Sequence, residues 1–465
     1  MEHSSARANI TQSAPVATHR HPSQQARHAL NTSTSSAATL PSRIDRPPIP
    51  VVVMQHVEEA AHLRHVRSVL VRAPHVRLLH LGRLDERIAA HLDGIAVAGE
   101  YGTGLAQQAL ERPGAGEVFV ATVRAIEDRD ATRLDQLLAI AEAVPASRAG
   151  LLSAFGWVSA ADLQGITKAL LLAAPPWRRE VGLAACAMHG VDPGSVLASA
   201  LRDGDAGLRA RALRVAGQSG RRDLVDACLA ALADEDPRCA FEAARSALLL
   251  GDRAAALAAL EALAVKPIAD AQPNLAALLS MLKVVTPKRA RSMLTRLSKD
   301  AVLIRSVIRG IAVAGDPHYV PWLIAQMHDL KRARLAGEAF SFIIGLDLAY
   351  LDLERKPPEN VEFGPNDDPD DDNVAMDEDD SLPWPDPEKL GAWWHANSQR
   401  FASGMRYFMG QPPSQAHCLT VLRTGFQRQR FAAAEYLALL QPGTKLFNTA
   451  APTRRQQRLL AEMGA

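Results

Sequence analysis

Glycine recurs at nearly constant spacing through the middle of this chain of 465 residues. Successive glycines lie 34, 30, 31, 64 and 30 residues apart, and Lys283 stands near the middle of the long interval, where one glycine is missing. Each glycine ends an apolar helical run. A repeat period of about 20–50 residues is typical of stacked repeat proteins, so we predict a surface for binding rather than a catalytic pocket. The predicted repeat turns contain Gly156, Gly190, Gly220, Gly251, Gly315 and Gly345.

The repeating unit is clearest in residues 207–236. A first helix is predicted from Gly207 to about Val215, and the apolar residues of a second helix follow the i, i+1, i+4, i+5, i+8 spacing of one helical face. These residues are Leu224, Val225, Cys228, Leu229 and Leu232. Asp236 before Pro237 then signals the start of the next helix. One such pair cannot bury its apolar face alone, so the pairs must stack into an all-α solenoid.

Composition supports helices throughout and divides the chain into five segments. Hydrophobic residues make up 48% of the chain but aromatic residues only 5%, so Ala, Leu and Val dominate, and Ala and Leu favour helices. The Ser- and Thr-rich start cannot bury enough surface to fold. We predict a disordered tail (1–49), an N-terminal helical cap (50–127), a repeat array (128–356), an acidic linker (357–383) and a C-terminal helical block rich in aromatic residues and Arg (384–465).

The acidic linker concentrates charge that the rest of the chain lacks. Residues 367–380 hold nine acidic and no basic residues, so the remainder carries +10 although the whole chain carries +1. This distribution fits a solvated linker, an acidic partner bound elsewhere, or internal masking of a basic surface. We expect residues 366–380 to bury nothing and to be dispensable for folding. The Asp, Asp/Asn and Gly order of an EF-hand is absent, which argues against calcium.

The units resemble short HEAT-type repeats of the phycobilisome-lyase kind. An Arg stands near the start of the first helix of several units, and an Ala-rich stretch precedes the glycine. These arginines are Arg179, Arg209, Arg238, Arg305 and Arg334. The Trp and Tyr signature of tetratricopeptide repeats and the Thr-Pro-Leu-His of ankyrin repeats are both missing.

The C-terminal block gathers aromatic residues in a chain otherwise poor in them. Residues 418–447 within it are predicted to form one more helix pair. The block is similar to a family of uncharacterised bacterial HEAT-repeat proteins often encoded near type VI secretion genes, a family with no established activity. The resemblance covers about residues 50–465. We predict that partner binding involves Trp384, Trp393, Trp394, Arg400, Arg406, Tyr407, Arg428 and Arg430.

Motifs for chemistry are weak. His62 and His65 form an HxxH pair without the HExxH of a zinc protease, and Gly99–Gly104 lacks the pattern of a phosphate loop, so it is interpreted as a turn between helices. The chain contains no His-Glu dipeptide, which sets it apart from the di-iron deoxyhypusine hydroxylases built on HEAT repeats. We therefore predict no catalytic residue, no cofactor and no metal.

The leading hypothesis is a non-enzymatic scaffold or adaptor that binds a protein partner, plausible in a process linked to type VI secretion. The alternative is a nucleic-acid-binding protein similar to HEAT-like DNA glycosylases, since Arg and aromatic residues intermingle in the C-terminal block. The chain has no apolar window of 18 residues, so no membrane span is expected. Single cysteines at Cys186, Cys228, Cys239 and Cys418 and the lack of a signal peptide favour the cytoplasm.

Overall fold

The computed structural model describes residues 47–265, 271–359, 364 and 376–464. Residues 48–465 make up one compact unit, and the described part of it contains 22 α-helices, seven 3-10 turns and no β-strand. The predicted all-α solenoid is confirmed. The tail predicted to be disordered lies outside the described residues, apart from its last three positions. Within the described ranges, no single helix is long and apolar enough to cross a membrane, and the one pair that passes together, residues 131–143 and 145–157, is bent by 118°.

Three helices precede the array: α1 (Pro50–Leu70), α2 (Leu78–Val97) and α3 (Gly99–Gln108). The interpretation of Gly99–Gly104 as a turn is wrong, because these residues form the first part of α3. Gly99 alone adopts a positive φ of 57°, and residues 100–104 continue as helix α3. A Cβ atom on Gly102 would lie 2.3 Å from the carbonyl oxygen of Ile95, so glycine at that position allows α3 to pack tightly against α2.

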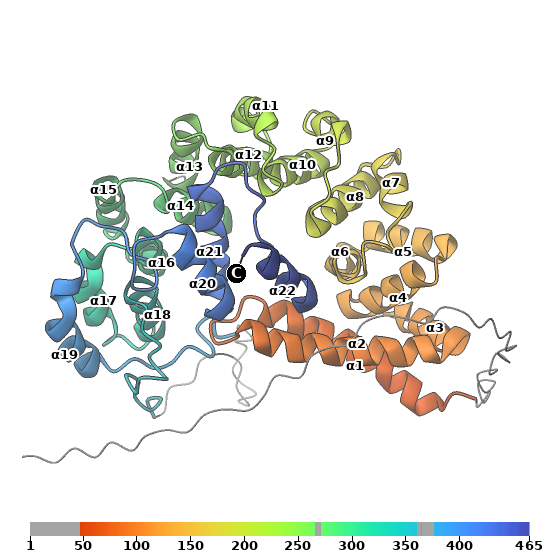
Figure 1. Ribbon diagram of the computed structural model, residues 1–465, viewed down its shortest axis with the longest axis horizontal. Coiled ribbons are helices and arrows are strands. Elements are labelled where there is room, and N and C mark those ends of the chain that lie inside the picture. The colour runs from red at the N-terminus through yellow and green to blue at the C-terminus, as the bar shows by residue number, and fades with distance from the viewer. Residues whose placement is uncertain (1–46, 266–270, 360–363, 365–375, 465) are drawn as a thin grey trace, which may run out of the picture. The chain divides into compact units, whose positions relative to one another are not determined.

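The array consists of two rows of helices that follow an arc (Figure 1). Each inner helix packs on the next inner helix, and the outer helices cover the convex side. The inner row is α4 (Ala115–Glu127), α6 (Arg148–Trp157), α8 (Pro176–His189), α10 (Ala206–Gln218), α12 (Pro237–Leu250), α14 (Ala271–Leu282), α16 (Ile304–Ala314) and α18 (Ala333–Ile344). The outer row is α5 (Ala131–Ala143), α7 (Ile166–Leu171), α9 (Ser195–Ala200), α11 (Val225–Ala230), α13 (Ala255–Val265), α15 (Pro287–Leu297) and α17 (Val320–Gln326).

The helix starts follow from the capping residues in the sequence. The Asp236 side chain accepts hydrogen bonds from the backbone N–H groups of Arg238 and Cys239, and Pro237 occupies the first helical position. Asp205 caps α10 in the same way, and Asp316 caps the 3-10 turn that begins at Pro317. The predicted start signal at Asp236 and Pro237 is therefore confirmed.

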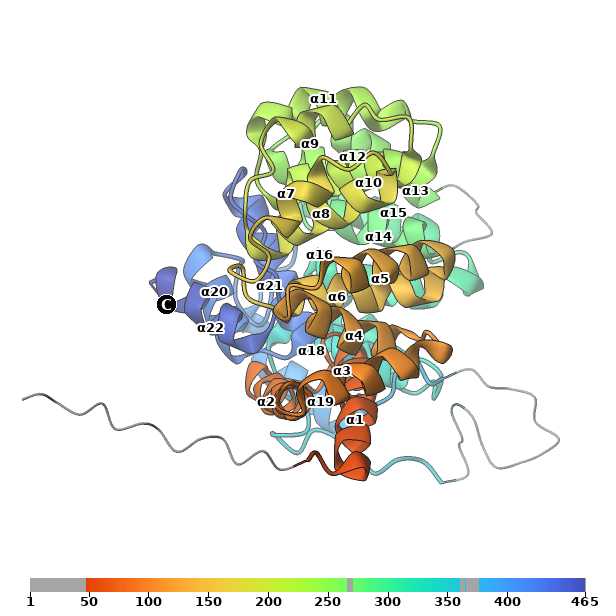
Figure 2. The same cartoon turned by 90° about the vertical axis from the view of Figure 1, so that its right-hand side faces the viewer.

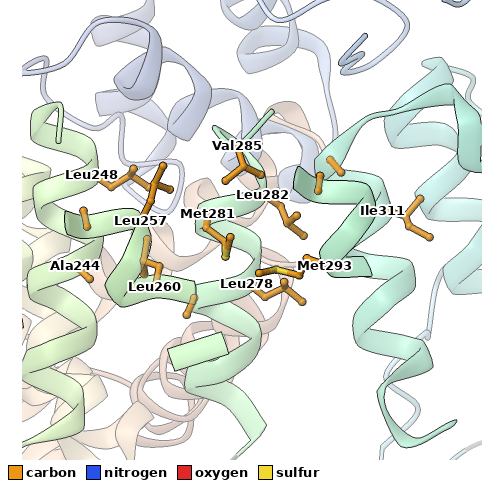
Figure 3. Packing of buried hydrophobic residues seen from close by; sticks show 14 of the residues in the cluster. Ala244, Leu248, Leu257, Leu260, Leu278, Met281, Leu282, Val285, Met293 and Ile311 are labelled. Carbon is orange, nitrogen blue, oxygen red and sulfur yellow. The ribbon is translucent and has the colours of Figure 1, made fainter. Parts of the chain in front are cut away.

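Two apolar clusters fill the space between the rows, one from α1 to α8 and a longer one from α8 to α18. Figure 3 shows part of the longer cluster, where Leu257 and Leu260 of α13 lie beside α12 and α14, and Met281 of α14 lies near Met293 of α15. Ala244 is fully buried on α12, where a small side chain allows neighbouring inner helices to approach closely. The helix pairs thus stack and bury their apolar faces against their neighbours, as the repeat pattern predicted.

The C-terminal block contains α19 (Pro387–Asn397), α20 (Gln415–Thr424), α21 (Gln427–Leu440) and α22 (Thr453–Glu462). The helix pair predicted for residues 418–447 corresponds to α20 and α21. Helix α19 packs against α17, at the end of the array, whereas α21 contacts α12 and α22 contacts α2. In Figure 1 α20–α22 lie on the concave side of the arc, and Figure 2 shows them displaced to one side of the two rows.

Candidate functional site

The glycine series marks the C-terminal ends of the inner helices. Gly190, Gly251, Gly315 and Gly345 are the C-caps of α8, α12, α16 and α18, each with a left-handed backbone, and Gly220 follows α10 with φ of 69°. Gly156 differs, because it lies inside α6 rather than in a turn. A Cβ atom there would come within 2.7 Å of the Met188 sulfur, so Gly156 provides space between α6 and α8.

These helix ends, here called the glycine edge, face the C-terminal block. The last carbonyl groups of an α-helix have no partner within the helix. Backbone N–H groups of the block supply partners: Tyr407 donates to Gly315 at 2.7 Å, Met409 donates to Phe342 at 2.7 Å, and Leu446 donates to Gln218 at 2.8 Å. The block therefore completes the hydrogen bonding of helices from several repeats.

Cationic side chains of the block bind further carbonyls of the glycine edge. Arg406 donates to the carbonyls of Leu282 at 2.8 Å and Val285 at 2.7 Å, at the end of α14. Arg455 donates to the carbonyl of Gly156 at 2.9 Å, and Lys445 to that of Gly190 at 2.7 Å. Helix C-termini carry partial negative charge, so their convergence favours cations. Burial lowers the pKa of Arg455 to about 10, which leaves it charged at neutral pH.

Lys283 replaces the missing glycine with an ion pair. The Lys283 side chain is only 6% exposed, and its Nζ lies 2.8 Å from Oε2 of Glu435 on α21. Arg245 of α12 contacts the other carboxylate oxygen at 2.8 Å. Burial alone would raise the pKa of Glu435, but Lys283 and Arg245 lower it to about 2. The repeat without a glycine is thus tied to the C-terminal block by charge.

Three of the eight predicted partner-binding residues are buried within the molecule. Arg430 is fully buried and donates to the Leu422 carbonyl and to Gln456, and Tyr407 is 7% exposed. Trp384 is buried with the Arg334 guanidinium 4.8 Å from its ring. The remaining residues lie closer to the surface: Trp393 and Trp394 pack half-buried against Phe401, Arg406 is half-buried, Arg428 is paired with Glu338, and Arg400 is exposed. Burial leaves Arg430, Tyr407 and Trp384 no surface for a partner.

The expectation that residues 366–380 bury nothing is wrong for Asp379. Residues 366–375 lie outside the described residues. Asp379 is 4% exposed and accepts two hydrogen bonds from Arg305 of α16, at 2.7 and 3.0 Å. Asp377 pairs with Arg334 of α18 at 2.7 Å. In earlier units the corresponding arginine pairs with an Asp about one helix pair later, as Arg209 does with Asp234 at 3.0 Å. The acidic segment therefore supplies carboxylates at the end of the array.

We expect Asp379→Asn to lower the free energy of unfolding by about 1.5–3 kcal/mol, because Arg305 loses a charged acceptor in a buried site. Glu378→Gln is the matched control, since the Glu378 side chain is 65% exposed and its pairs with Arg305 and Arg309 are worth at most about 1 kcal/mol. Urea denaturation of both variants measures the difference. Equal losses in the two variants would show that the burial of Asp379 adds nothing to the free energy of unfolding.

The two ends of the array meet at a seam. The seam comprises the α1–α2 turn (residues 71–77), the segment after α18 (residues 345–357) and the start of α21. Arg77 pairs with Asp347 at 3.0 Å, and the backbone N–H of Gln427 donates to the Val76 carbonyl at 2.8 Å. A hollow of about 640 Å³ lies here, with Phe342, Leu348 and Phe426 among its apolar lining residues.

The other candidate residues give no catalytic geometry. His62 lines a second, shallower hollow between α1 and α2, and its HxxH partner His65 does not. Among the described residues no group of three His, Cys, Asp or Glu side chains is placed to hold a metal ion. All four cysteines are buried and free, and burial raises the pKa of Cys186 to about 11. Such thiols are poorly reactive at neutral pH.

Comparison with family models gives one match. A model of HEAT repeats matches residues 194–280, which span α9 to α14. The middle of the array consists of HEAT repeats. The same packing of inner helices continues on both sides of the matched region. No curated protein and no solved structure matches the chain.

Proposed function

We propose that this HEAT-repeat protein is a non-enzymatic scaffold or adaptor that binds a protein partner at the seam. HEAT arrays present extended surfaces that suit protein binding. In this chain the C-terminal block covers the glycine edge, so the accessible binding surface is displaced from the concave side. The hollow at the seam is the observation that carries the proposal, because its volume of about 640 Å³ is within the range of binding pockets.

The contacts around the hollow favour a fixed rather than an adaptable site. Phe342 is 9% exposed and packs on Phe408 of the C-terminal block, and Arg428 holds Glu338 through two hydrogen bonds of 2.8 and 3.0 Å. Burial raises the pKa of Glu338, while Arg428 opposes that rise. Walls fixed by separate segments pre-organise a site and reduce the entropy lost on binding.

The resemblance of the C-terminal block to proteins encoded near type VI secretion genes supports a role for this scaffold in a process linked to such a system. The nucleic-acid alternative relied on the arginines of the same block. Arg406 and Arg430 donate to carbonyl and amide oxygens of the protein itself, and Arg428 is paired with Glu338. These three guanidinium groups are occupied, which favours the protein-binding scaffold.

The test is to fill the hollow and compare partners. Ala349 lines the hollow and is exposed, so Ala349→Trp should block the site without disturbing the core. Ala258 is exposed on outer helix α13, and Ala258→Trp is the matched control. We expect affinity purification from the native cells to recover a specific protein with the wild type and with Ala258→Trp, and to lose it by at least about tenfold with Ala349→Trp. A partner retained equally by all three proteins would contradict the proposal.

A further inference from the structure

Arg355 lines the hollow at the seam with a half-buried side chain. Its Nε and Nη2 atoms are inaccessible to solvent and make no hydrogen bond within the described residues. Its backbone is fixed, since its N–H donates to the Trp384 carbonyl at 2.8 Å. Burying a hydrogen-bond donor of a charged group without an acceptor is costly. Two unsatisfied buried donors in a pocket therefore point to a ligand that supplies the missing acceptor.

Most of the carboxylates around the hollow are already paired. Three of the four carboxylates that line it are held by cations other than Arg355. The pairs are Glu338 with Arg428 at 2.8 Å, Asp347 with Arg77 at 3.0 Å, and Asp352 with Lys389 at 3.4 Å. The fourth, Glu354, precedes Arg355 in sequence, but neither buried nitrogen of Arg355 bonds to it. Of the two lining cations that these pairs leave over, Lys356 is exposed to solvent, whereas Arg355 has buried donors without an acceptor among the described residues, so Arg355 is the better placed to hold an anion.

The walls beside Arg355 are apolar. Phe342 is 9% exposed, Leu348 is 2% exposed, and Phe426 lines the same space beneath the Arg77 guanidinium, 4.6 Å from its ring. The planar guanidinium group of Arg matches a carboxylate through two parallel hydrogen bonds. A ligand that fits this site has a carboxylate joined directly to an apolar group. The carboxyl terminus of a polypeptide with an apolar last residue has this chemistry, and its capture is a recurring mode of peptide recognition.

We propose that the hollow binds the carboxyl terminus of the partner protein, with Arg355 holding the terminal carboxylate and Phe342, Leu348 and Phe426 surrounding an apolar last side chain. The proposal rests on the protein-binding function above and specifies which part of the partner is recognised. Asp and Glu side chains within a chain fit less well, because the peptide would then continue on both sides of the carboxylate into a hollow bounded by three segments.

The test compares free-acid and amidated peptides on the full-length protein. The probe is a set of fluorescein-labelled hexapeptides ending in Leu, Ile, Val or Phe with mixed preceding residues, each made as the acid and as the C-terminal amide. Fluorescence anisotropy should show at least one acid that binds about tenfold or more tightly than its amide, and Arg355→Gln should lose that difference. Arg296→Gln, at an exposed position on α15, is the matched control and should retain it.

Thermal denaturation separates recognition from a structural role. Because no described residue accepts a hydrogen bond from the two buried nitrogens of Arg355, Arg355→Gln should leave the Tm unchanged or raise it, whereas loss of a structural arginine would lower it. Equal binding of acids and amides, no binding of either, or full binding by Arg355→Gln would each overturn this inference. If Ala349→Trp still abolishes partner recovery in that case, the scaffold function stands and only terminal recognition fails. If it does not, both fail.

Discussion

Replacement of Glu435 by Gln should lower the free energy of unfolding by about 3–5 kcal/mol, because it leaves Lys283 and Arg245 buried without a counter-charge. The Glu435 side chain is 8% exposed and joins two inner helices to α21 through contacts of 2.8 Å. Gln keeps the shape but not the charge. The control is Glu261→Gln, which breaks the surface pair with the half-exposed Arg289 and should cost at most about 1 kcal/mol. Guanidinium denaturation distinguishes them, and a loss below about 1 kcal/mol for Glu435→Gln would contradict the prediction.

The same carboxylate predicts a pH dependence. Its pKa is lowered to about 2 in the folded protein, against about 4.3 for an unfolded Glu. A depressed carboxyl pKa stabilises the fold above the unfolded value, and that stability is lost as the pH falls through the folded value. Between pH 4 and pH 2 the wild type should therefore lose about 2 kcal/mol more than Glu435→Gln does. Parallel curves of unfolding free energy against pH for the two proteins would exclude Glu435 as the source of the pH dependence.

The second large effect is expected at the glycine edge. Gly315 has φ of 70° and ψ of 18°, and a Cβ atom there would lie 2.1 Å from the carbonyl oxygen of Tyr407. Gly315→Ala must either strain this contact or separate residues 406–407 from the end of α16. We expect a loss of about 4 kcal/mol, of which about 1 kcal/mol is the cost of a left-handed alanine.

Gly190→Ala isolates the backbone contribution. Gly190 has nearly the same conformation, with φ of 67° and ψ of 24°, but the nearest atom to its Cβ position is Nζ of Lys445 at 3.9 Å. Gly190→Ala should therefore cost only about 1 kcal/mol. Chemical denaturation gives the loss of unfolding free energy for each variant. The difference between the two losses is the cost of the close contact between position 315 and Tyr407. If the two losses are equal, contact with the C-terminal block does not explain why glycine stands at position 315.

The sequence specified the array better than it specified the site. Periodic glycines and Asp caps such as Asp236 are local signals, since φ and side-chain capping are decided within a few residues. The docking of the C-terminal block is not local. It depends on backbone carbonyls, which any residue provides, so nothing in the sequence marks Gln218 or Leu282 as acceptors. The cations of the block are visible in the sequence. Lys445 and Arg455, however, lie outside the cluster of aromatic residues on which the predicted partner-binding set was based.

Arg430 was predicted to bind a partner but is buried, and the reason is specific to this residue. An Arg among aromatic residues is typical both of interfaces and of a core in which all its donors are satisfied. Gln456, which accepts from the Arg430 guanidinium at 2.5 Å, lies 26 residues later, and the sequence does not reveal that α22 folds back onto α21. Arg355 was missed for the opposite reason. Its significance comes from the partners it lacks, which only a three-dimensional arrangement can show.

The contacts of the glycine edge also limit how this array can change in length. An open HEAT solenoid can gain or lose a repeat, because each unit touches only its neighbours. In this chain, repeats between Gly156 and Gly345 each bond to a particular position of one C-terminal block. An inserted helix pair would move every later helix end out of register with its partner, and would separate Arg77 from Asp347. We infer that the C-terminal block fixes the number of repeats in the array, because its contacts match the helix ends at one set of positions.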